Sequence, residues 1–493
     1  MNPPDSERDR LRKLIYSAME VSQEDKDLPD AATVMPRAHF EALRIEVPLV
    51  IGARGTGKSF WHNILTNPGK LAFVRAAYPE IKLPVGIGML SAFSARQEGN
   101  KGQPPKDFLL SLGNSPAAWR TLWQSIIAAK LFPERLFKSR DSWKTRTDKI
   151  RGDIENFNAE LRSVDLDRAK SKRPLLLVFD ALDTISDEWE LTVLAIRELL
   201  KLVTDYRLLS ALRFKVFLRA DIAQDSNVSS FPDASKLFAN RAELIWEKED
   251  LFTLLFQRLV NASDGDIFIR LANTINAGTF KEVPAREPPS WILERAYRTD
   301  SDLHRRLFEH LAGKAMGGGA SGTKRGIPFS WIYNHLLDAR GAVSPRSFCV
   351  ALHEAASETR PGQGPTPLSP KDLEEGVRKA SSDRVNELRE EYPWIDPAMK
   401  ALQRSGARVP CEKEAMIQAW EAEGTIPSIL KNYKSRQGLP GTVRKGEYRA
   451  FLQALEQIGI ISRMPDDDRY QVPDVYRVAF GLGRKGGIPV KRH

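Results

Sequence analysis

The chain has 493 residues, of which 42% are hydrophobic and 28% are charged. This usage is that of a globular protein, and it excludes a mostly disordered chain, a collagen-like chain and a coiled-coil rod. The length predicts about three domains. Lys and Arg together number 74 and Asp and Glu 64, so the formal net charge is +10. This basic excess favours a polyanionic partner, and leaves nucleotide, nucleic acid and acidic protein open.

The cysteine content and the apolar runs indicate in which cellular compartment the protein is expected. The two cysteines, Cys349 and Cys411, are too few for a disulfide framework and indicate reducing surroundings. The purest apolar run, at 175–179, is far shorter than the ~20 residues that span a bilayer. The first residues are charged and lack the apolar segment of a secretory signal. We therefore expect a cytoplasmic protein with no membrane partner.

A phosphate-binding loop follows a polar N-terminal segment, residues 1–39. Residues 47–51 form a short apolar strand that leads into GARGTGKS at 52–59, and a helical pattern follows. This is G-x-x-x-x-G-K-[ST] between a strand and a helix, as the motif requires. Its glycines let the backbone approach phosphate closely, and successive N–H groups form an anion cradle. The predicted nucleotide contacts are Gly52, Arg54, Gly55, Thr56, Gly57, Lys58, Ser59 and Phe60.

Two of these residues have defined chemical roles in ATP-binding loops. The Lys58 side chain is expected to reach the β- and γ-phosphates, and the Ser59 hydroxyl to ligate Mg²⁺. We place the nucleotide domain at 40–250, with a second core strand at 83–89 and a helical insertion at about 95–172. Within the insertion, Trp119 and Trp123 share one face of a helix that begins at Ser115, which is typical of core packing. Residues 138–173 alternate in charge and predict an exposed helical arm.

A second motif supplies a candidate metal ligand. Residues 175–179 read LLLVF, as expected for a strand buried on both faces of a parallel sheet. Asp180 follows at the C-terminal end of that strand, where open α/β sheets bind ligand, and is expected to hold Mg²⁺ directly or through water. Many related ATPases have an acid at the next position, which here is Ala181. The next acid, Asp183, either positions the attacking water or caps the following helix.

The third strand is predicted at 214–218, after a helix at 188–203, and a last core strand at 242–246. Arg219 and Asp221 follow the third strand and are candidates for sensing the γ-phosphate, the alternative being a salt bridge within the loop. Residues 251–360 predict a helical lid. There Ser344 and Pro345 begin a helix whose first turn carries Arg346. The Arg346 guanidinium is expected either to reach the γ-phosphate or to form a surface ion pair.

The C-terminal part begins with a Pro/Gly/Ser linker at 361–370 and charged helices to residue 404. Residues 405–493 predict helices at 413–424 and 447–459, followed by a hairpin with its turn at 465–468, which is a winged-helix pattern. Residues 431–493 contain 13 Lys and Arg against six Asp and Glu, a net charge of +7. The tail either binds duplex DNA through its phosphates or serves as a protein-interaction module. The candidate phosphate contacts are Arg444, Lys445, Arg449, Arg484, Lys485, Lys491 and Arg492.

Four stretches, GARGTGKS, LLLVFDALD, KVFLRAD and SPRSF, together with the C-terminal pattern, resemble the P-loop ATPases of the STAND and KAP-like AAA+ groups, which are common in bacterial phage-defence systems. The resemblance covers about residues 40–360 and, more weakly, the tail. It implies an α/β P-loop NTPase of the ASCE/AAA+ type, with sheet order 5-1-4-3-2, a helical lid and a winged helix. It also implies Lys58 and Ser59 on phosphate and Mg²⁺, Asp180 on Mg²⁺, Arg346 as the lid arginine, and a homo-oligomer.

Three functions are compatible with these motifs, and all involve ATP and Mg²⁺. The first is a nucleotide-driven regulatory or motor subunit of a multi-protein bacterial system, with antiphage defence as its role and a separate effector protein as partner. The second is a DNA-binding AAA+ initiator or transposition helper, with the basic tail as its DNA reader. The third is a nucleotide-bound scaffold that does not hydrolyse ATP, which the Ala181 departure suggests.

Overall fold

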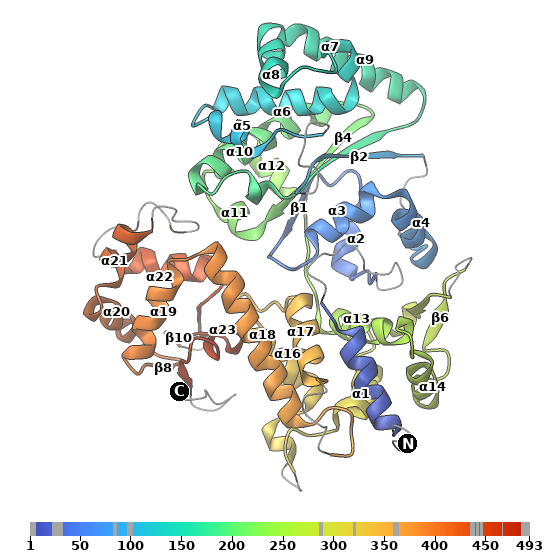
Figure 1. The fold of residues 1–493 in the computed structure, drawn as a ribbon, viewed down its shortest axis with the longest axis vertical. Helices are drawn as coiled ribbons and strands as arrows, with labels where there is room; N and C mark the ends of the chain where they lie inside the picture. Colours follow the sequence, from blue (N-terminus) through green and yellow to red (C-terminus); the bar gives the residue numbers. More distant parts are fainter. Residues whose placement is uncertain are drawn as a thin grey trace. The chain divides into compact units, whose positions relative to one another are not determined.

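The computed structural model divides the chain into two compact units (Figure 1), Arg37–Ile245 and the combination of Met1–Pro36 with Trp246–His493. The N-terminal segment therefore belongs with the C-terminal part of the chain, and the polypeptide passes between the units twice. The structure describes residues 6–21, 33–81, 86–95, 102–284, 289–318, 322–357, 364–433, 439, 443, 447–465 and 467–484.

A five-stranded parallel sheet forms the centre of the first unit. Its strands are β1 (Leu49–Gly52), β2 (Gly88–Phe93), β3 (Leu175–Phe179), β4 (Leu212–Arg219) and β5 (Arg241–Glu243), in the order β2-β3-β4-β1-β5. Read from the other edge, this is the expected 5-1-4-3-2 order. The predicted fold class, an α/β P-loop NTPase with a parallel sheet flanked by helices, is confirmed.

The predicted core strands are all present, and all but the strand at 175–179 have shifted ends. The run at 175–179 is buried at every position, as its uninterrupted apolar sequence requires. The second strand begins at Gly88, later than the predicted 83–89, part of which lies outside the described residues. The shift has a structural reason: the Gly88 N–H donates to Pro174 O over 2.9 Å, so the strand can pair only where its neighbour begins.

Helices surround this sheet. Those of the first unit are α2 (Phe40–Leu43), α3 (Lys58–Thr66), α4 (Pro68–Ala77), α5 (Lys106–Ser111), α6 (Pro116–Leu131), α7 (Pro133–Leu136), α8 (Trp143–Gly152), α9 (Ile154–Lys170), α10 (Trp189–Asp205), α11 (Ala220–Gln224) and α12 (Ala234–Ala239). As predicted, Ser115 caps α6, and Trp119 and Trp123 are buried. The Trp123 indole N–H donates to Ala195 O of α10 over 2.8 Å, which joins the insertion to the core.

The expectation of an exposed arm at 138–173 is wrong for α9. Its Asp165 side chain is buried and accepts hydrogen bonds from the backbone N–H groups of Ser210, Ala211 and Leu212 at 2.8, 2.7 and 2.9 Å. One carboxylate therefore satisfies three donors at the start of β4. The alternating charges of α9 conceal this, because a buried capping carboxylate has the same sequence appearance as a solvated one.

Lys215 is a buried cation in the middle of β4. Its side chain is fully buried, and its Nζ donates to Arg44 O over 2.9 Å and to Val47 O over 2.5 Å. These two carbonyls border the turn that leads into β1. Burial lowers the pKa of Lys215 to about 7, with Glu46 opposing the shift. A neutral amine has two N–H groups, which match the two carbonyl acceptors.

The second unit is mainly helical. Its helices are α1 (Glu7–Ala18), α13 (Lys248–Asn261), α14 (Asp266–Ile275), α15 (Ser301–Ala312), α16 (Pro328–Leu336), α17 (Pro345–Ala355), α18 (Pro370–Glu391), α19 (Ile395–Arg404), α20 (Lys413–Ala422), α21 (Thr425–Asn432), α22 (Tyr448–Gln457) and α23 (Asp474–Arg477). An antiparallel pair, β6 (Phe280–Glu282) with β7 (Trp291–Leu293), interrupts the predicted all-helical lid. Strands of three residues are too short to give an alternating pattern.

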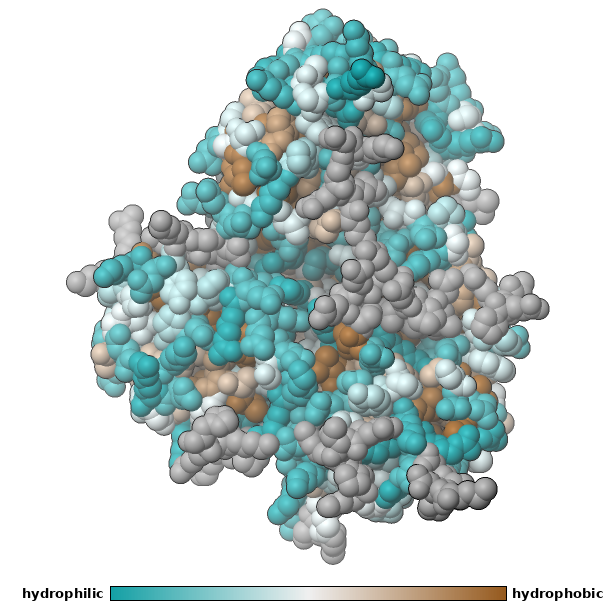
Figure 2. All heavy atoms as spheres, viewed as in Figure 1, coloured by the Kyte–Doolittle hydropathy of each residue, from teal (hydrophilic) through white to brown (hydrophobic). Residues whose placement is uncertain are grey.

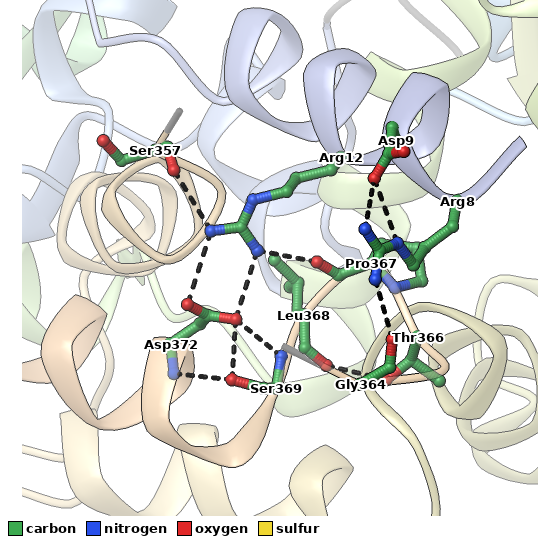
Figure 3. A network of polar contacts seen from close by, with 10 residues as sticks. All are labelled: Arg8, Asp9, Arg12, Ser357, Gly364, Thr366, Pro367, Leu368, Ser369 and Asp372. Carbon is green, nitrogen blue, oxygen red and sulfur yellow. Dashed lines mark hydrogen bonds and ion pairs between the residues drawn. The ribbon is translucent and has the colours of Figure 1, made fainter. Parts of the chain in front are cut away.

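The N-terminal helix is fixed to the lid by a buried ion pair (Figure 3). Arg12 donates to Asp372 at 3.1 and 3.3 Å and to the carbonyls of Pro367 and Ser357 at 2.7 and 3.1 Å. Asp372 also completes the capping box of α18 with Ser369. The apolar face of α1, which includes Leu14 and Ile15, lies in the same core as α13 and α17. The polar segment predicted at 1–39 therefore contains an integral helix.

Helix α18 continues into the C-terminal part of the second unit. Its first half packs in the lid core, and Val385 and Leu388 pack in the core of the tail. The predicted hairpin is present as β9 (Ser462–Arg463) paired antiparallel with β10 (Tyr470–Gln471). Cys411, just after β8 (Arg408–Val409), forms an antiparallel bridge with Tyr470 on the other side of β10. The last strand, β11 (Gly483–Arg484), pairs in parallel with β8.

The surface facing the viewer in Figure 2 is mainly hydrophilic, and hydrophobic atoms occur there in separate patches. Every helix in the described ranges is too short or too polar to span a lipid bilayer.

The buried lysine gives a test of the core by pH. Because the folded pKa of Lys215 is about 7 and the unfolded value is about 10.4, the unfolded chain binds the extra proton between these pH values. The contribution of Lys215 to folding stability should therefore rise with pH across that window, by at most about 1.4 kcal/mol per pH unit. We expect the stability difference between the parent and Lys215→Met to change by this slope, measured by denaturant unfolding. Lys144→Met, at an exposed position of α8, should show no such trend; a flat difference for Lys215→Met would contradict the low pKa.

Candidate functional site

The loop between β1 and α3 has the backbone geometry of an anion cradle. Gly55 and Gly57 have φ of +78° and +102°, in the left-handed region that favours glycine. A Cβ added at Gly52 would lie 2.4 Å from the Thr56 hydroxyl, so only glycine fits there. That buried hydroxyl donates to Ala53 O over 2.8 Å and closes the loop on itself. The loop is therefore shaped by its own contacts.

Lys58 is the first residue of α3, and its side chain folds back over the loop. The Nζ donates to Gly52 O over 3.0 Å and to Ala53 O over 2.8 Å. Burial lowers the pKa of Lys58, and the nearby carboxylates of Asp183 and Asp180 oppose that shift. The ammonium is thus held at the mouth of the cradle by two neutral acceptors, which phosphate oxygens can replace.

The remaining loop residues are placed as follows. Ser59 is exposed in the first turn of α3, a position open to a metal–phosphate complex. Arg54 is half-buried at the loop tip. The Phe60 ring packs edge-to-face on Trp61, with centroids 5.1 Å apart. Trp61 in turn donates from its indole N–H to His39 Nδ1 over 2.8 Å. These aromatic contacts anchor α3. They do not test the nucleotide contact predicted for Phe60, which stays a prediction.

Asp180 lies buried at the C-terminal end of β3, and its N–H donates to Phe93 O of β2 over 2.9 Å. The chain then turns sharply, since Ala181 has φ +55° and ψ +32°. An L-residue in this left-handed conformation costs roughly 1–2 kcal/mol. Ala181, which stands where many related ATPases have an acid, is therefore a turn residue. The turn leads into a 3-10 helix at Leu182–Thr184, which carries the next acid, Asp183.

Asp183 and Arg219 meet beside the loop. Arg219 ends β4, and its Cα is the register partner of Gly52. Its guanidinium contacts Asp221 twice, at 3.1 and 2.8 Å, and donates to Asp183 over 3.2 Å. Asp183 caps neither the 3-10 helix nor α10, whose cap positions are Ala181 and Glu188. The loop salt bridge considered for Arg219 is present, and it holds the cation at the edge of the sheet where the glycine loop begins.

These side chains form one electrostatic group. Lys58 interacts electrostatically with Asp183, Asp180, Arg219 and Asp221. Carboxylate and hydroxyl oxygens are the ligands that Mg²⁺ prefers, and Mg²⁺ is usually held by one or two carboxylates together with substrate phosphates. The Asp180 carboxylate near Lys58 and the exposed Ser59 hydroxyl are donors of this kind, so they fit a Mg²⁺ site that phosphates would complete.

Two groups of predicted residues lie in the second unit. Arg346 is in the first turn of α17 and pairs with Glu387 of α18 at 3.4 Å. In the tail, Arg449 is exposed on α22, and Arg484 pairs with Asp474 at 3.3 Å. The other predicted phosphate contacts, Arg444, Lys445, Lys485, Lys491 and Arg492, lie outside the described residues.

Sequence reasoning missed the supporting residues of the site. Lys215 holds the turn before β1, and its signal was a single lysine between Phe214 and Val216 in a strand otherwise typical of a sheet interior. Asp165 holds the start of β4. No spacing rule would have found Asp165, because its partners are backbone N–H groups 45–47 residues away.

No protein-family model and no curated protein matches the sequence. Among solved structures, the chain is similar to the Aeropyrum pernix ORC2 protein in its ADPNP–ADP complexes, with 13% identity over 93% of each chain and a TM-score of 0.39. It is also similar to Drosophila ORC bound to DNA, with 12% identity over 96% of this chain and 92% of that chain, TM-score 0.30. The ADP form of the A. pernix protein gives 14% identity, 93% coverage of both chains and a TM-score of 0.30. We therefore base function on the residues of this chain.

The Asp183–Arg219 contact predicts a coupling in nucleotide affinity. Arg219→Met should weaken ATP binding by about tenfold or more, because the carboxylates beside Lys58 then lose their compensating cation. Adding Asp183→Asn should restore part of the loss by removing one of those charges. Nucleotide titration of the parent, both single variants and the double variant measures the coupling.

A surface pair of the same unit provides the control. Arg207 and Asp233 contact each other at 2.9 Å with both side chains exposed, so the same cycle at that pair should leave ATP affinity unchanged. Additive effects at Asp183 and Arg219 would contradict a shared electrostatic role at the nucleotide.

Proposed function

We propose that the unit Arg37–Ile245 binds Mg²⁺–ATP and hydrolyses it, and that the chain is a regulatory or motor ATPase. One observation carries the proposal: Lys58, Asp180 and the Asp183–Arg219 pair meet at the carboxyl edge of a parallel sheet, beside a glycine loop that begins α3. This is the edge at which open α/β sheets bind ligand.

The residues divide the work as follows. Loop N–H groups and the start of α3 bind the phosphates, and Lys58 places its charge on the β- and γ-oxygens. Ser59 and Asp180 would hold Mg²⁺, which when bound neutralises charge on the phosphates. Asp183 is the candidate for orienting the attacking water, and Arg219 is placed to sense the γ-phosphate and to keep Asp183 oriented.

Hydrolysis separates this proposal from the scaffold alternative. The turn at Ala181 directs Asp183 toward the Arg219 guanidinium, which supports Asp183 as a substitute for the acid that many related ATPases have two positions earlier, at the place of Ala181. If no carboxylate orients the attacking water, the unit would bind ATP without hydrolysing it, which is the scaffold alternative.

The first test removes the phosphate cation. Lys58→Ala should lower ATP binding or turnover by several powers of ten, a loss on the order of 4 kcal/mol or more. Lys144→Ala, an exposed lysine of α8, is the matched control and should behave as the parent. Steady-state ATPase rates and nucleotide titration provide the measurement, with circular dichroism as the check on folding. A folded Lys58→Ala protein with parental activity would remove the nucleotide assignment.

The carboxylates are separated by a second test. Asp180→Asn should keep most of the ATP affinity and lose Mg²⁺-dependent turnover, because the amide preserves shape and removes the metal-binding charge. Asp183→Asn should likewise keep binding and lose turnover if Asp183 orients water. Parental rates in Asp183→Asn together with no turnover in Asp180→Asn would assign water positioning elsewhere. If the parent itself binds ATP without hydrolysing it, the scaffold function holds.

The biological role rests on the resemblance to STAND and KAP-like ATPases. It supports a nucleotide-driven switch in a multi-protein bacterial system, with antiphage defence as the role, a separate effector subunit and a homo-oligomeric active state in the cytoplasm. In that role Arg346 would serve as the lid arginine, released from Glu387. Sedimentation of the chain with ATP and with ADP tests the switch, since only the ATP state should assemble.

Duplex DNA is a second candidate partner, favoured by the fold of the tail. Helices α19, α20 and α22 accompany a small antiparallel arrangement in which β10 lies between β9 and Cys411. We propose that this is a winged helix in which α22 presents Arg449.

The hairpin favours the alternative, a protein partner. Its two arginines each pair with an aspartate of the turn, Arg463 with Asp468 and Arg469 with Asp467, so their charges are less available to DNA phosphates.

A DNA reader of this kind should bind mainly through charge. With about four to six phosphate contacts, affinity should fall with salt at a log–log slope of roughly −4 to −5. Reversing charge at Arg444, Lys445 and Arg449 should flatten that slope and weaken binding to all sequences alike, measured by fluorescence anisotropy on duplex DNA at two salt concentrations. Lys144→Glu in the other unit is the control. Absence of binding by the parent at low salt would leave the tail as a protein-interaction module.

A further inference from the structure

The two most exposed large hydrophobic side chains among the described residues belong to one corner of the first unit. Leu208 is 85% exposed and Leu166 is 55% exposed, and the next value is 41%. Leu166 is on α9, and Leu208 ends a 3-10 helix, Tyr206–Leu208, that follows α10. A single exposed leucine is ordinary. Two of them from segments far apart in the sequence indicate a contact surface, which we call the leucine corner.

Hydrogen bonds hold the two segments together. Asp165, the residue before Leu166, accepts a hydrogen bond over 2.8 Å from the N–H of Ser210, which is two residues after Leu208. The leucine corner therefore lies at the amino end of β4, and the glycine loop begins at the opposite edge of the sheet.

Exposed cations surround Leu166. Arg162 and Lys170 lie one turn before and one turn after it on α9, at a spacing that places the three side chains in a row. All three are exposed. Lys172 and Arg173 are also exposed and follow the end of the helix. These four cations have no ion pair within the ranges that the structure describes.

The acidic groups of α9 are engaged away from this row. Glu160 pairs with Arg135 of α7 at 2.6 Å, and Asp167 interacts electrostatically with the same arginine. Asp165 is buried and accepts only from backbone N–H groups. The leucine corner thus presents an apolar contact flanked by cations that no described carboxylate contacts.

This combination favours one class of partner. Contacts to nucleic-acid phosphates use cations, and they give no role to two exposed leucines. Helices that bind membranes present a wide apolar face, whereas this corner has two large apolar side chains. An amphipathic acidic segment of a protein matches both features, because its apolar side chains can cover the leucines while its carboxylates pair with the cations.

We propose that the leucine corner binds an amphipathic acidic segment of a partner protein. Leu166 and Leu208 supply the apolar contact, and Arg162 and Lys170 supply the charge on either side of Leu166. Positive charge at the corner would also speed encounter with an acidic segment. The proposal is independent of ATP binding, since the glycine loop lies at the other edge of the sheet.

The test titrates a labelled peptide against the full chain by fluorescence anisotropy. The probe is a helical peptide of glutamate, alanine and leucine, with the leucines on one face. Two matched peptides replace either the glutamates by lysine or the leucines by serine. The parent protein should bind the acidic, leucine-containing peptide about tenfold or more tightly than either matched peptide.

Variants at the corner separate its two contributions. Leu208→Ser should weaken binding of the acidic peptide about fivefold or more, because it removes an apolar contact. Arg162→Gln together with Lys170→Gln should weaken binding by about the same factor. Added salt should weaken binding to the parent protein, and it should have a smaller effect on this charge variant.

The controls are exposed positions outside the corner. Leu110→Ser, at a leucine of α5 that is 41% exposed, and the pair Lys138→Gln with Lys144→Gln should bind the peptide as the parent does. Lys58→Ala should also bind it as the parent does, so a failure of the ATPase proposal would leave this result unchanged. Circular dichroism checks that each variant is folded.

The proposal is overturned if the parent protein does not bind the acidic peptide at low salt, or if the folded corner variants bind it as tightly as the parent. Duplex DNA and vesicles of phosphatidylserine and phosphatidylcholine are titrated in parallel. If the corner variants lose affinity for one of these and keep the peptide affinity of the parent, the corner belongs to nucleic acid or to a membrane instead.

Discussion

Parallel pairing of β4 with its two neighbours is the constraint on which the proposed nucleotide site depends. Because all five strands run in one direction, their carboxyl ends meet at one edge of the sheet. The register sets Gly52 opposite Arg219, and Asp180 follows the strand on the other side of β4. Two anchors hold this register at the opposite end, Asp165 at the start of β4 and Lys215 on the turn before β1. The chemistry at one edge thus relies on buried polar contacts near the other.

Much of the first unit followed from sequence, for identifiable reasons. A strand buried on both faces has an uninterrupted apolar run, so 175–179 was predicted to the residue. The phosphate loop is specified by glycine geometry and needs no tertiary information. The sheet order came from the resemblance alone, since apolar runs do not encode which strands are neighbours. The prediction for the insertion was wrong where a charged side chain is buried, as Asp165 is.

The second unit was predicted less well. The helix at Glu7–Ala18 packs against partners that are hundreds of residues away, and a polar segment gives no sign of them. Helix α21 was missed because its eight residues include a proline and follow a glycine, both of which indicate a turn. The pair between Arg346 and Glu387 joins two helices whose spacing in sequence carries no signal. These features escaped prediction for a common reason: they depend on contacts between residues that are far apart in the sequence.

The buried pair of Arg12 and Asp372 has a consequence for synthesis of the chain. Its members are 360 residues apart, so at about 5–20 residues per second the N-terminal helix leaves the ribosome roughly 20–70 s before its acidic partner is made. During that interval the whole first unit and the helices α13 to α17 are synthesised, so the apolar face of α1 gains core partners while Arg12 still lacks its carboxylate. A chain that ends before α18 would therefore keep the apolar partners of α1 and bury the Arg12 guanidinium without the carboxylate that pairs with it.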